Sequence, residues 1–119
     1  MASFAVKVII GGLLAVVFAG CASPPDDLYY WGSYEDVLYD MYIKPGNASL
    51  TDQILRMEEQ IQQADAKGKA VPPGFYAHLG YLYVNDGDYD AAAIHFQREK
   101  EHFPESTDFI DGILKRMKK

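Results

Sequence analysis

The segment that decides the fold is residues 73–106, which read PGFYAHLGYLYVNDGDYDAAAIHFQREKEHFPES. A proline opens the segment, Pro104 closes it, and Gly87 divides it into two apolar stretches of helical length. Proline and glycine at such points end helices rather than continue them. The small residues Gly80 and Ala92 allow two helices to approach closely, while aromatic side chains fill the space on either side. The segment therefore predicts two packed antiparallel helices.

The pattern of this segment resembles a tetratricopeptide repeat, and its 34 positions equal the length of that repeat. The resemblance is carried by Tyr76, Leu79, Gly80 and Tyr83 in the first helix, Gly87, Asp88 and Tyr89 at the turn, Ala92 and Phe96 in the second helix, and Pro104 at the end. Glu99 departs from the pattern, which usually has an alanine there, so we expect looser packing against a following helix. Because one repeat cannot bury its apolar face alone, the resemblance implies stacked helices beside it.

The rest of the chain supplies such helices. Apolar residues recur at helical spacing in two earlier segments and one later segment, and no segment shows the alternation expected of a strand. The expected helices are, approximately, residues 33–43, 50–67, 74–85, 89–103 and 107–117. Ser33 is placed to cap the first helix, with Asp36 three residues on, and Ser106 or Thr107 to cap the last. We therefore expect an all-α domain over residues 29–119, a short tetratricopeptide-like array of about five antiparallel helices.

The helix expected over residues 50–67 has one apolar side and one polar side. Its apolar side is expected to hold Ile54, Leu55, Met57, Ile61 and Ala64. Gln60 belongs to the polar side at this spacing, together with the neighbouring arginine, glutamate and glutamine residues, and we expect that side to face solvent.

The N-terminal region has the features of a secretory signal. Lys7 precedes the apolar run of residues 8–18, and the small Ala19 and Gly20 follow it. Cys21 is the only cysteine in the sequence and comes directly after this pair. Residues 18–21, Phe-Ala-Gly-Cys, resemble the lipobox of bacterial lipoproteins. The resemblance implies a signal peptide over residues 1–20 and covalent lipid on Cys21.

The segment after this cysteine is short and extended in character. Residues 21–28 contain two adjacent prolines and show no apolar periodicity, so we expect a lipidated tether that keeps the domain near its membrane. Ala22 and Ser23 follow the cysteine, and the absence of aspartate there resembles lipoproteins sorted to the outer membrane of enterobacteria. The expected location is therefore the periplasmic face of the outer membrane.

The whole chain is also similar to a family of small bacterial lipoproteins of unknown function, domain-of-unknown-function family 4810. The resemblance is carried by the lipobox, by residues 30–35 (YWGSYE), by Leu38 and Tyr39, and by residues 73–83 (PGFYAHLGYLY). It implies a role in the cell envelope, beside lipoproteins of the curli-secretion type. It implies no activity and no catalytic residues.

The charge of the chain excludes one class of partner. The formal net charge is −6, and removal of residues 1–20 would take away a lysine and no acidic residue. A chain of this charge repels nucleic acid, so no nucleic-acid partner is expected. With Cys21 lipidated, no cysteine would remain for a disulfide, and the fold would depend on apolar burial.

Six aromatic residues near the lipid end form a candidate binding surface. These residues are Tyr29, Tyr30, Trp31, Tyr34, Tyr39 and Tyr42. Such side chains can stack on a glycan or a peptide, or lie at a membrane interface. Alternatively, Trp31, Tyr34 and Tyr42 fill the space between helices. Tyr29 and Tyr30 fit the helical spacing least well, so we expect them to be the better exposed pair.

A second candidate surface follows from the repeat. In tetratricopeptide repeats the first helix lines the concave side, which here implies Ala77, Tyr81, Val84 and Asn85. Repeats that clamp a peptide carboxyl terminus have asparagine and lysine where this chain has Tyr81 and Ala77, so that mode is disfavoured. The groove would suit an extended segment or a partner's helix. The alternative is that neighbouring helices cover this face.

Two clusters of potential ligands, one of aspartates and one of histidines with a glutamate, have the spacing of candidate metal sites. Asp86, Asp88 and Asp90 alternate as in a calcium loop, but the sixth and twelfth positions counted from Asp86 are Ala91 and Gln97 rather than glycine and glutamate. His95, Glu99 and His102 share one helical face, and no ligands converge on them from other segments, so we expect a solvated face. No metal and no cofactor apart from the lipid is expected.

No catalytic motif is present in the sequence. It contains no nucleophile elbow and no phosphate-binding loop. We therefore expect a non-enzyme without a small-molecule substrate. The predicted function is that of a membrane-anchored adaptor that holds another envelope protein. The alternative is a lipoprotein that binds a glycan such as peptidoglycan through the tyrosine and tryptophan cluster.

Overall fold

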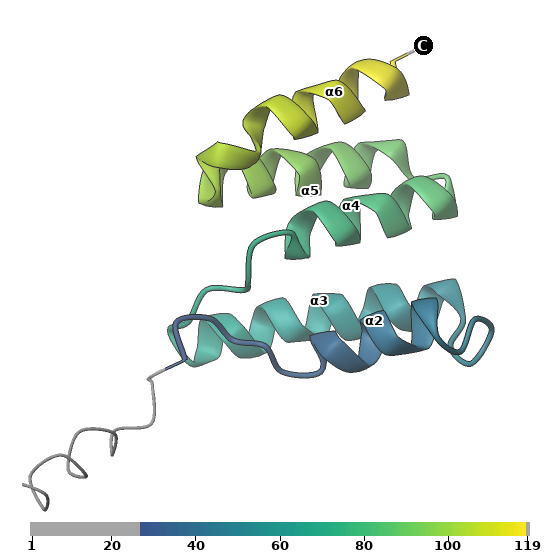
Figure 1. Cartoon of the computed structure of the whole chain (residues 1–119), viewed down its shortest axis with the longest axis vertical. Coiled ribbons are helices and arrows are strands. Elements are labelled where there is room, and N and C mark those ends of the chain that lie inside the picture. Colours follow the sequence, from purple (N-terminus) through teal and green to yellow (C-terminus); the bar gives the residue numbers. More distant parts are fainter. Residues whose placement is uncertain (1–26, 119) are drawn as a thin grey trace, which may run out of the picture.

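The computed structural model describes residues 27–118, in which the helices form a stack (Figure 1). The predicted signal peptide, Cys21 and the first part of the tether lie outside the described residues. The helices, labelled as in Figure 1, are α2 (Tyr34–Tyr42), α3 (Leu50–Ala66), α4 (Phe75–Asp86), α5 (Tyr89–His102) and α6 (Thr107–Met117), and a 3-10 turn η1 (Pro104–Ser106) precedes α6. The prediction of an all-α domain with about five helices is confirmed.

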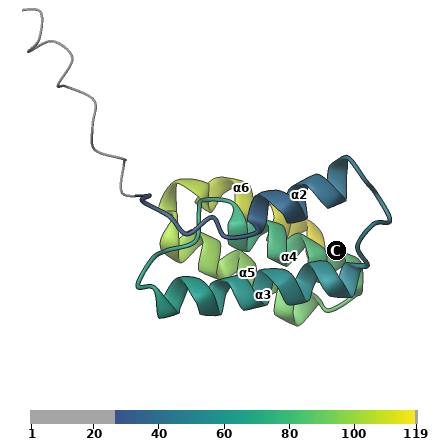
Figure 2. The same cartoon turned by 90° about the horizontal axis from the view of Figure 1, so that it is seen from below.

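The helices are arranged in two layers. Successive helices run in opposite directions along the stack (Figure 1), and the view from below shows α2, α4 and α6 on one side and α3 and α5 on the other (Figure 2). Among residues 27–118 the one β-type pairing is an isolated bridge between Tyr29 and Ala70, where the Tyr29 segment meets the loop before α4. The chain therefore enters the stack at one end of the helices.

Two of the helices begin with a side-chain cap. The Ser49 hydroxyl accepts a hydrogen bond from the Asp52 backbone N–H at 3.1 Å at the start of α3. The Asp88 carboxylate accepts one from the Ala91 N–H at 2.9 Å at the start of α5. These bonds satisfy backbone donors that have no partner within the helix. Gly87, with φ +86°, ends α4 and makes the tight turn into α5.

The caps expected for the first and last helices are wrong. Ser33 precedes α2, but its side chain makes no capping hydrogen bond. Ser106 and Thr107 at the start of α6 donate their hydroxyl protons backwards, to the carbonyls of Phe103 and Pro104 at 2.8 and 2.7 Å. These hydroxyl groups form local hydrogen bonds to the carbonyls of the preceding turn in place of a capping bond to the first N–H groups of α6.

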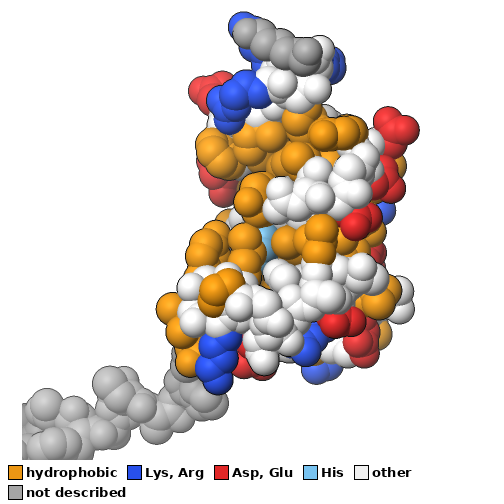
Figure 3. All heavy atoms as spheres, turned by 90° about the vertical axis from the view of Figure 1, so that its right-hand side faces the viewer, with side chains coloured by type: hydrophobic (Ala, Val, Ile, Leu, Met, Phe, Trp, Pro, Cys, Tyr) orange, Lys and Arg blue, Asp and Glu red, His pale blue; other side chains and the backbone are white. Residues whose placement is uncertain are grey.

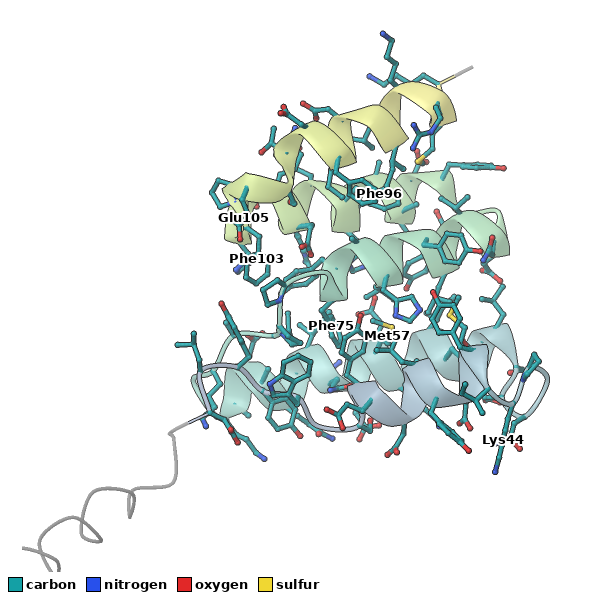
Figure 4. All side chains as sticks on the ribbon, in the orientation of Figure 1. Lys44, Met57, Phe75, Phe96, Phe103 and Glu105 are labelled. Carbon is teal, nitrogen blue, oxygen red and sulfur yellow. The ribbon has the colours of Figure 1, made fainter. Side chains whose placement is uncertain are left out.

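The apolar core has two parts. The larger part lies between α2, α3 and α4, and Figure 4 shows Met57 and Phe75 pointing toward each other across it. The smaller part lies between α5 and α6 around Phe96 and Ile110. Gly80 of α4 faces Phe96, and a Cβ atom at Gly80 would come within 2.9 Å of the Phe96 ring. Helices α4 and α5 therefore approach so closely that a side chain at position 80 would force the ring to move.

A buried carboxylate joins these two helices. Glu99 of α5 is 2% exposed, and its oxygens accept hydrogen bonds from the backbone N–H groups of Gly74 at 2.7 Å and Ala77 at 3.3 Å. A negative charge at a helix N-terminus is favourable because the unsatisfied N–H groups and the helix dipole point toward it. The expected solvated face for His95 and Glu99 is wrong, because both side chains are buried between helices.

Candidate partner-binding groove

The layer of α2, α4 and α6 carries a groove with a volume of about 740 Å³. We call it the groove and define it by its lining residues: Tyr34, Leu38 and Tyr42 of α2; Ala77, His78, Tyr81 and Val84 of α4; Tyr89 and Phe96 of α5; and Phe109, Ile113, Arg116 and Met117 of α6. Apart from His78 and Arg116, the residues on each of α2, α4 and α6 are spaced three or four positions apart, so each helix contributes one stripe of its surface. Three helices that are separate in the sequence thus build one surface.

The groove exposes large apolar side chains to solvent. Tyr42, Tyr81, Tyr89 and Phe109 all line it, and all are exposed. Figure 3 shows the side of the stack that lies on the right in Figure 1. Hydrophobic side chains gather over this side, and many of the Lys and Arg side chains lie toward the top and bottom of the stack. A contiguous exposed apolar surface that a small protein does not cover is typical of an interaction site.

Arg116 is the one charged residue that lines the groove. It lies in the last turn of α6, and no Asp or Glu is among the lining residues. Its guanidinium lies over Gly112, because a Cβ atom there would be 3.7 Å from Arg116 Nη1. No salt bridge within the described part of the chain involves Arg116. The groove is therefore apolar with a single positive group, in a chain of net charge −6.

His78 and Tyr34 make up the inner wall of the groove. The His78 Nε2 atom lies 3.1 Å from the Met41 sulfur, and the His78 ring packs 5.7 Å from the Tyr34 ring. Burial lowers the pKa of His78 below its ordinary value of 6.5. Burial, with smaller contributions from Glu99 and Tyr42, raises the pKa of Tyr34 to about 12. Both side chains are therefore uncharged at neutral pH, which keeps this wall of the groove weakly polar.

Comparison with known proteins identifies the family. The model of the family described as "Domain of unknown function (DUF4810)" matches residues 28–113, which is most of the chain. The chain belongs to this family. The matched region runs from the segment before α2 to Ile113 of α6, so it includes all of the groove lining except Arg116 and Met117. Comparison with curated proteins and with solved structures found no match.

The structure brings together three of the residues predicted to bind a partner. Ala77, Tyr81 and Val84 lie along one side of α4 and line the groove. Asn85, the fourth residue of that predicted surface, is exposed beyond them and is not among the lining residues. Neighbouring helices cover this face only in part, because Tyr81 is 47% exposed while Ala77 and Val84 are half-buried against the smaller core.

Tyr29 and Tyr30 lie elsewhere, near the entry of the chain into the stack. Tyr29 packs edge-on against Phe103 with the ring centroids 6.1 Å apart. Tyr30 donates its hydroxyl proton to Gln63 Oε1 at 2.5 Å, and the Lys67 ammonium lies 4.5 Å from its ring centroid. Both tyrosines are half-buried, so the expectation that they are the better exposed pair is wrong.

The exposed members of the aromatic cluster are on or just before α2. Tyr42 is 69% exposed, Tyr39 is exposed, and Trp31 is 44% exposed and stacks on Tyr34 at 6.5 Å. Of the three residues that the packing alternative placed between the helices, Tyr34 is buried in the core, and Trp31 and Tyr42 are not. The six aromatic residues are therefore divided between the core, the groove and the chain entry, and do not form one surface.

Several groove residues were missed at the level of sequence. Phe109, Ile113 and Met117 repeat at four-residue spacing on α6, which the sequence predicted only as the last helix of the stack. The repeat resemblance identified Ala77 and Tyr81 on α4, and their four-residue spacing is also present on α6. The missing information was that α6 packs in the same layer as α4, which becomes evident only in the structure (Figure 2).

Outside the groove lining, a polar cluster connects α3, α4 and α5. The Glu58 Oε1 atom lies 3.2 Å from His95 Nε2 and accepts the Tyr83 hydroxyl proton at 3.0 Å. Burial and this hydrogen bond raise the pKa of Tyr83 to about 12. Within residues 27–118 no group of three or more His, Cys, Asp or Glu side chains is placed to hold a metal ion.

A helix that crosses a membrane must be both long and apolar. None of the helices in the described part of the chain combines the length and the apolar character that a membrane crossing needs.

Proposed function

We propose that this chain is a lipoprotein, anchored through Cys21 to the periplasmic face of the outer membrane, that holds another envelope protein in the groove. The observation that carries the proposal is the exposed apolar lining contributed by α2, α4 and α6. Such surfaces on soluble domains are typical of protein-interaction sites. The proposal assigns the chain no catalytic residue, no cofactor beyond the lipid and no nucleic-acid partner.

A second element of the proposal is that α4 and α5 form a tetratricopeptide-like repeat. Three features support it: Gly80 lies against the Phe96 ring, Ala92 is fully buried, and Gly87 makes a left-handed turn between the helices. In this interpretation α2, α4 and α6 are the inner helices of the array, which explains why the groove lies on their side. Glu99, where such repeats usually have alanine, serves as the cap of α4.

The anchor would raise the efficiency of a weak contact. Two proteins attached to the same membrane meet at a high effective concentration, so a groove of modest affinity can still hold its partner. The partner class that we propose is an envelope protein, such as a lipoprotein of the curli-secretion type, which the family resemblance implies. The work of the adaptor would be to position that protein during assembly or secretion.

The test compares two single substitutions of exposed apolar residues. Tyr81→Arg places a charge in the groove, and Ile94→Arg places the same charge on α5 outside it, at a residue that is 56% exposed. After formaldehyde cross-linking in cells, the tagged wild-type chain and Ile94→Arg should co-purify with the same envelope protein, and Tyr81→Arg should lose it. Equal recovery in all three would contradict the proposal.

A glycan remains the alternative ligand, and the exposed Trp31, Tyr39 and Tyr42 are the observation in its favour. Aromatic rings can stack on the apolar faces of sugars while their polar groups remain solvated. A pull-down with purified peptidoglycan sacculi separates the two functions. Retention of the chain on sacculi, and its loss in Trp31→Ala, would favour the glycan over a protein partner.

A further inference from the structure

We propose that the occupant of the groove is an amphipathic helix of the partner protein, which places an acidic side chain against Arg116. This inference rests on the proposed function, because it specifies the chemistry of the partner that the groove would hold. It is carried by three observations: the apolar lining, the spacing of that lining on three helices, and the position of a single positive group at the last turn of α6.

The apolar lining favours a helix over an extended segment. The lining offers side-chain hydrogen-bonding groups only at its four tyrosines, His78 and Arg116, fewer than the two backbone groups per residue that an extended segment brings, and its aliphatic residues offer none. An extended segment laid on them would bury backbone N–H and C=O groups without partners, which is costly. A helix satisfies these groups internally. A strand could pair only with a sheet edge, and in residues 27–118 the one bridge, Tyr29 with Ala70, lies at the chain entry and outside the groove lining.

The spacing of the lining residues suits the surface of a helix. One stripe on each helix has this spacing: Tyr34, Leu38 and Tyr42 on α2, Ala77, Tyr81 and Val84 on α4, and Phe109, Ile113 and Met117 on α6, with His78 and Arg116 lining the groove beside these stripes. Each set therefore advances by about one turn at a time. Ridges with this spacing accept the side chains of a packed helix between them, and an amphipathic helix presents anchors at i, i+3 or i+4, and i+7.

Arg116 defines the charge that the partner must bring. All acidic residues of this chain are absent from the groove lining, although they outnumber the lysines and arginines 17 to 11. A partner with a basic residue at this point would face the guanidinium without compensation, whereas an Asp or Glu can accept two parallel hydrogen bonds from it. Charge complementarity of this kind selects the partner and its direction more than it adds affinity.

The test uses a display library of random peptides of about 15 residues, long enough for four helical turns. Peptides that bind the purified chain are counter-selected against the Tyr81→Arg variant, so only peptides that need the groove remain. Their affinity is then measured for the wild type, Arg116→Glu and Lys115→Glu. Lys115 is an exposed lysine next to Arg116 on α6 and does not line the groove, so it controls for net charge.

The expected peptides have apolar residues at helical spacing with an Asp or Glu beside them, and become helical on binding. Arg116→Glu should weaken them by about fivefold, the effect of one surface ion pair, and Lys115→Glu should have a smaller effect. Groove-binding peptides with apolar residues at alternate positions, or equal effects of the two substitutions, would overturn this inference and leave the adaptor proposal standing. A library without any groove-dependent peptide would count against both.

Discussion

A single buried carboxylate, that of Glu99, connects α5 to the first turn of α4. Its two oxygens accept the N–H groups of Gly74 and Ala77, at the point where Gly74 has a φ of +87°. Without this carboxylate both of these part-buried donors would lose their partner. A buried donor that loses its acceptor costs more than the hydrogen bond itself contributes.

Glu99→Gln should therefore destabilise the fold by about 1–3 kcal/mol, because the amide carries no charge and its NH₂ group cannot accept from the Ala77 N–H. The measurement is the free energy of unfolding in urea. Glu101→Gln is the matched control, since Glu101 is an exposed residue of the same helix. Equal stability of Glu99→Gln and Glu101→Gln would mean that the cap contributes nothing.

Two histidines make the stability depend on pH. Burial lowers the pKa of His95, with a further lowering from Arg98, and the Glu58 carboxylate at 3.2 Å opposes this only in part. His95 is also stacked between the rings of Tyr83 and Tyr76. Burial likewise lowers the pKa of His78. Below the ordinary value of 6.5 the unfolded chain thus takes up protons more readily than the folded chain.

The free energy of unfolding should consequently fall as the pH falls from 6.5 toward the lower pKa values of the folded state. Urea unfolding at about pH 7.5 and about pH 5.5, on either side of the ordinary histidine pKa, measures this slope. His95→Gln, which removes one of the two groups, should give a shallower slope. Identical slopes in the wild type and the variant would exclude His95 as a cause.

Burial of individual polar residues could not be predicted from spacing alone. Gln60 was expected on the solvated side of its helix, yet it is buried and donates to the Trp31 carbonyl. Leu55 was expected on the buried side and is 61% exposed. The partners of Gln60 and Glu99 come from segments 29 and 22 or more residues away, so the local pattern holds no information about them.

At the scale of the helices, most of the architecture was predictable. The helix at Thr107–Met117 has the expected bounds, and the bounds of the other helices differ from the expected ones by no more than one residue. Glycine, proline and apolar periodicity determine these bounds, and all three can be read in the sequence. The arrangement of α2, α4 and α6 in one layer depends on packing between distant segments. The groove as a whole could therefore not be predicted from the sequence.

The two glycines inside helices should respond oppositely to one substitution. Alanine favours a helix over glycine by about 1 kcal/mol. At Gly112 an added Cβ meets only Arg116 Nη1 at 3.7 Å, so Gly112→Ala should stabilise the fold by about 0.5–1 kcal/mol. At Gly80 it meets the Phe96 ring at 2.9 Å, so Gly80→Ala should destabilise it, by about 1–3 kcal/mol.

Thermal unfolding followed by circular dichroism measures both variants against the wild type. The midpoint should rise for Gly112→Ala and fall for Gly80→Ala. If both midpoints rose, helix propensity alone would determine the stability of the variants. That result would contradict the close approach of α4 and α5 at Gly80.

At the scale of the whole molecule, the chain entry and the groove use different parts of the stack. Tyr29 and Tyr30 fix the incoming chain against Phe103 and the loop at Ala70, where Figure 4 also shows Phe103 at the same end of the helices. None of these residues lines the groove. A domain tethered through this entry would therefore keep the groove open to a partner.

The proposed anchor has a direct consequence for fractionation. Cys21→Ser removes the thiol that would carry the lipid, so the variant should appear in the soluble fraction of detergent-free extracts and lose metabolic labelling with fatty acid. Two or more acyl chains anchor a protein stably, which is why the wild type should remain with the membranes. A variant that stays with the membranes would contradict the lipid anchor.

The most direct measurement places a photo-activated cross-linking amino acid in the groove of the chain in living cells. With the cross-linker at position 81, one envelope protein should be captured, and the attachment point in that protein should lie on a helix. With the cross-linker at position 94, equally accessible but outside the groove, this product should be absent. The same product from both positions, or none from position 81, would contradict the claim that the groove holds a partner.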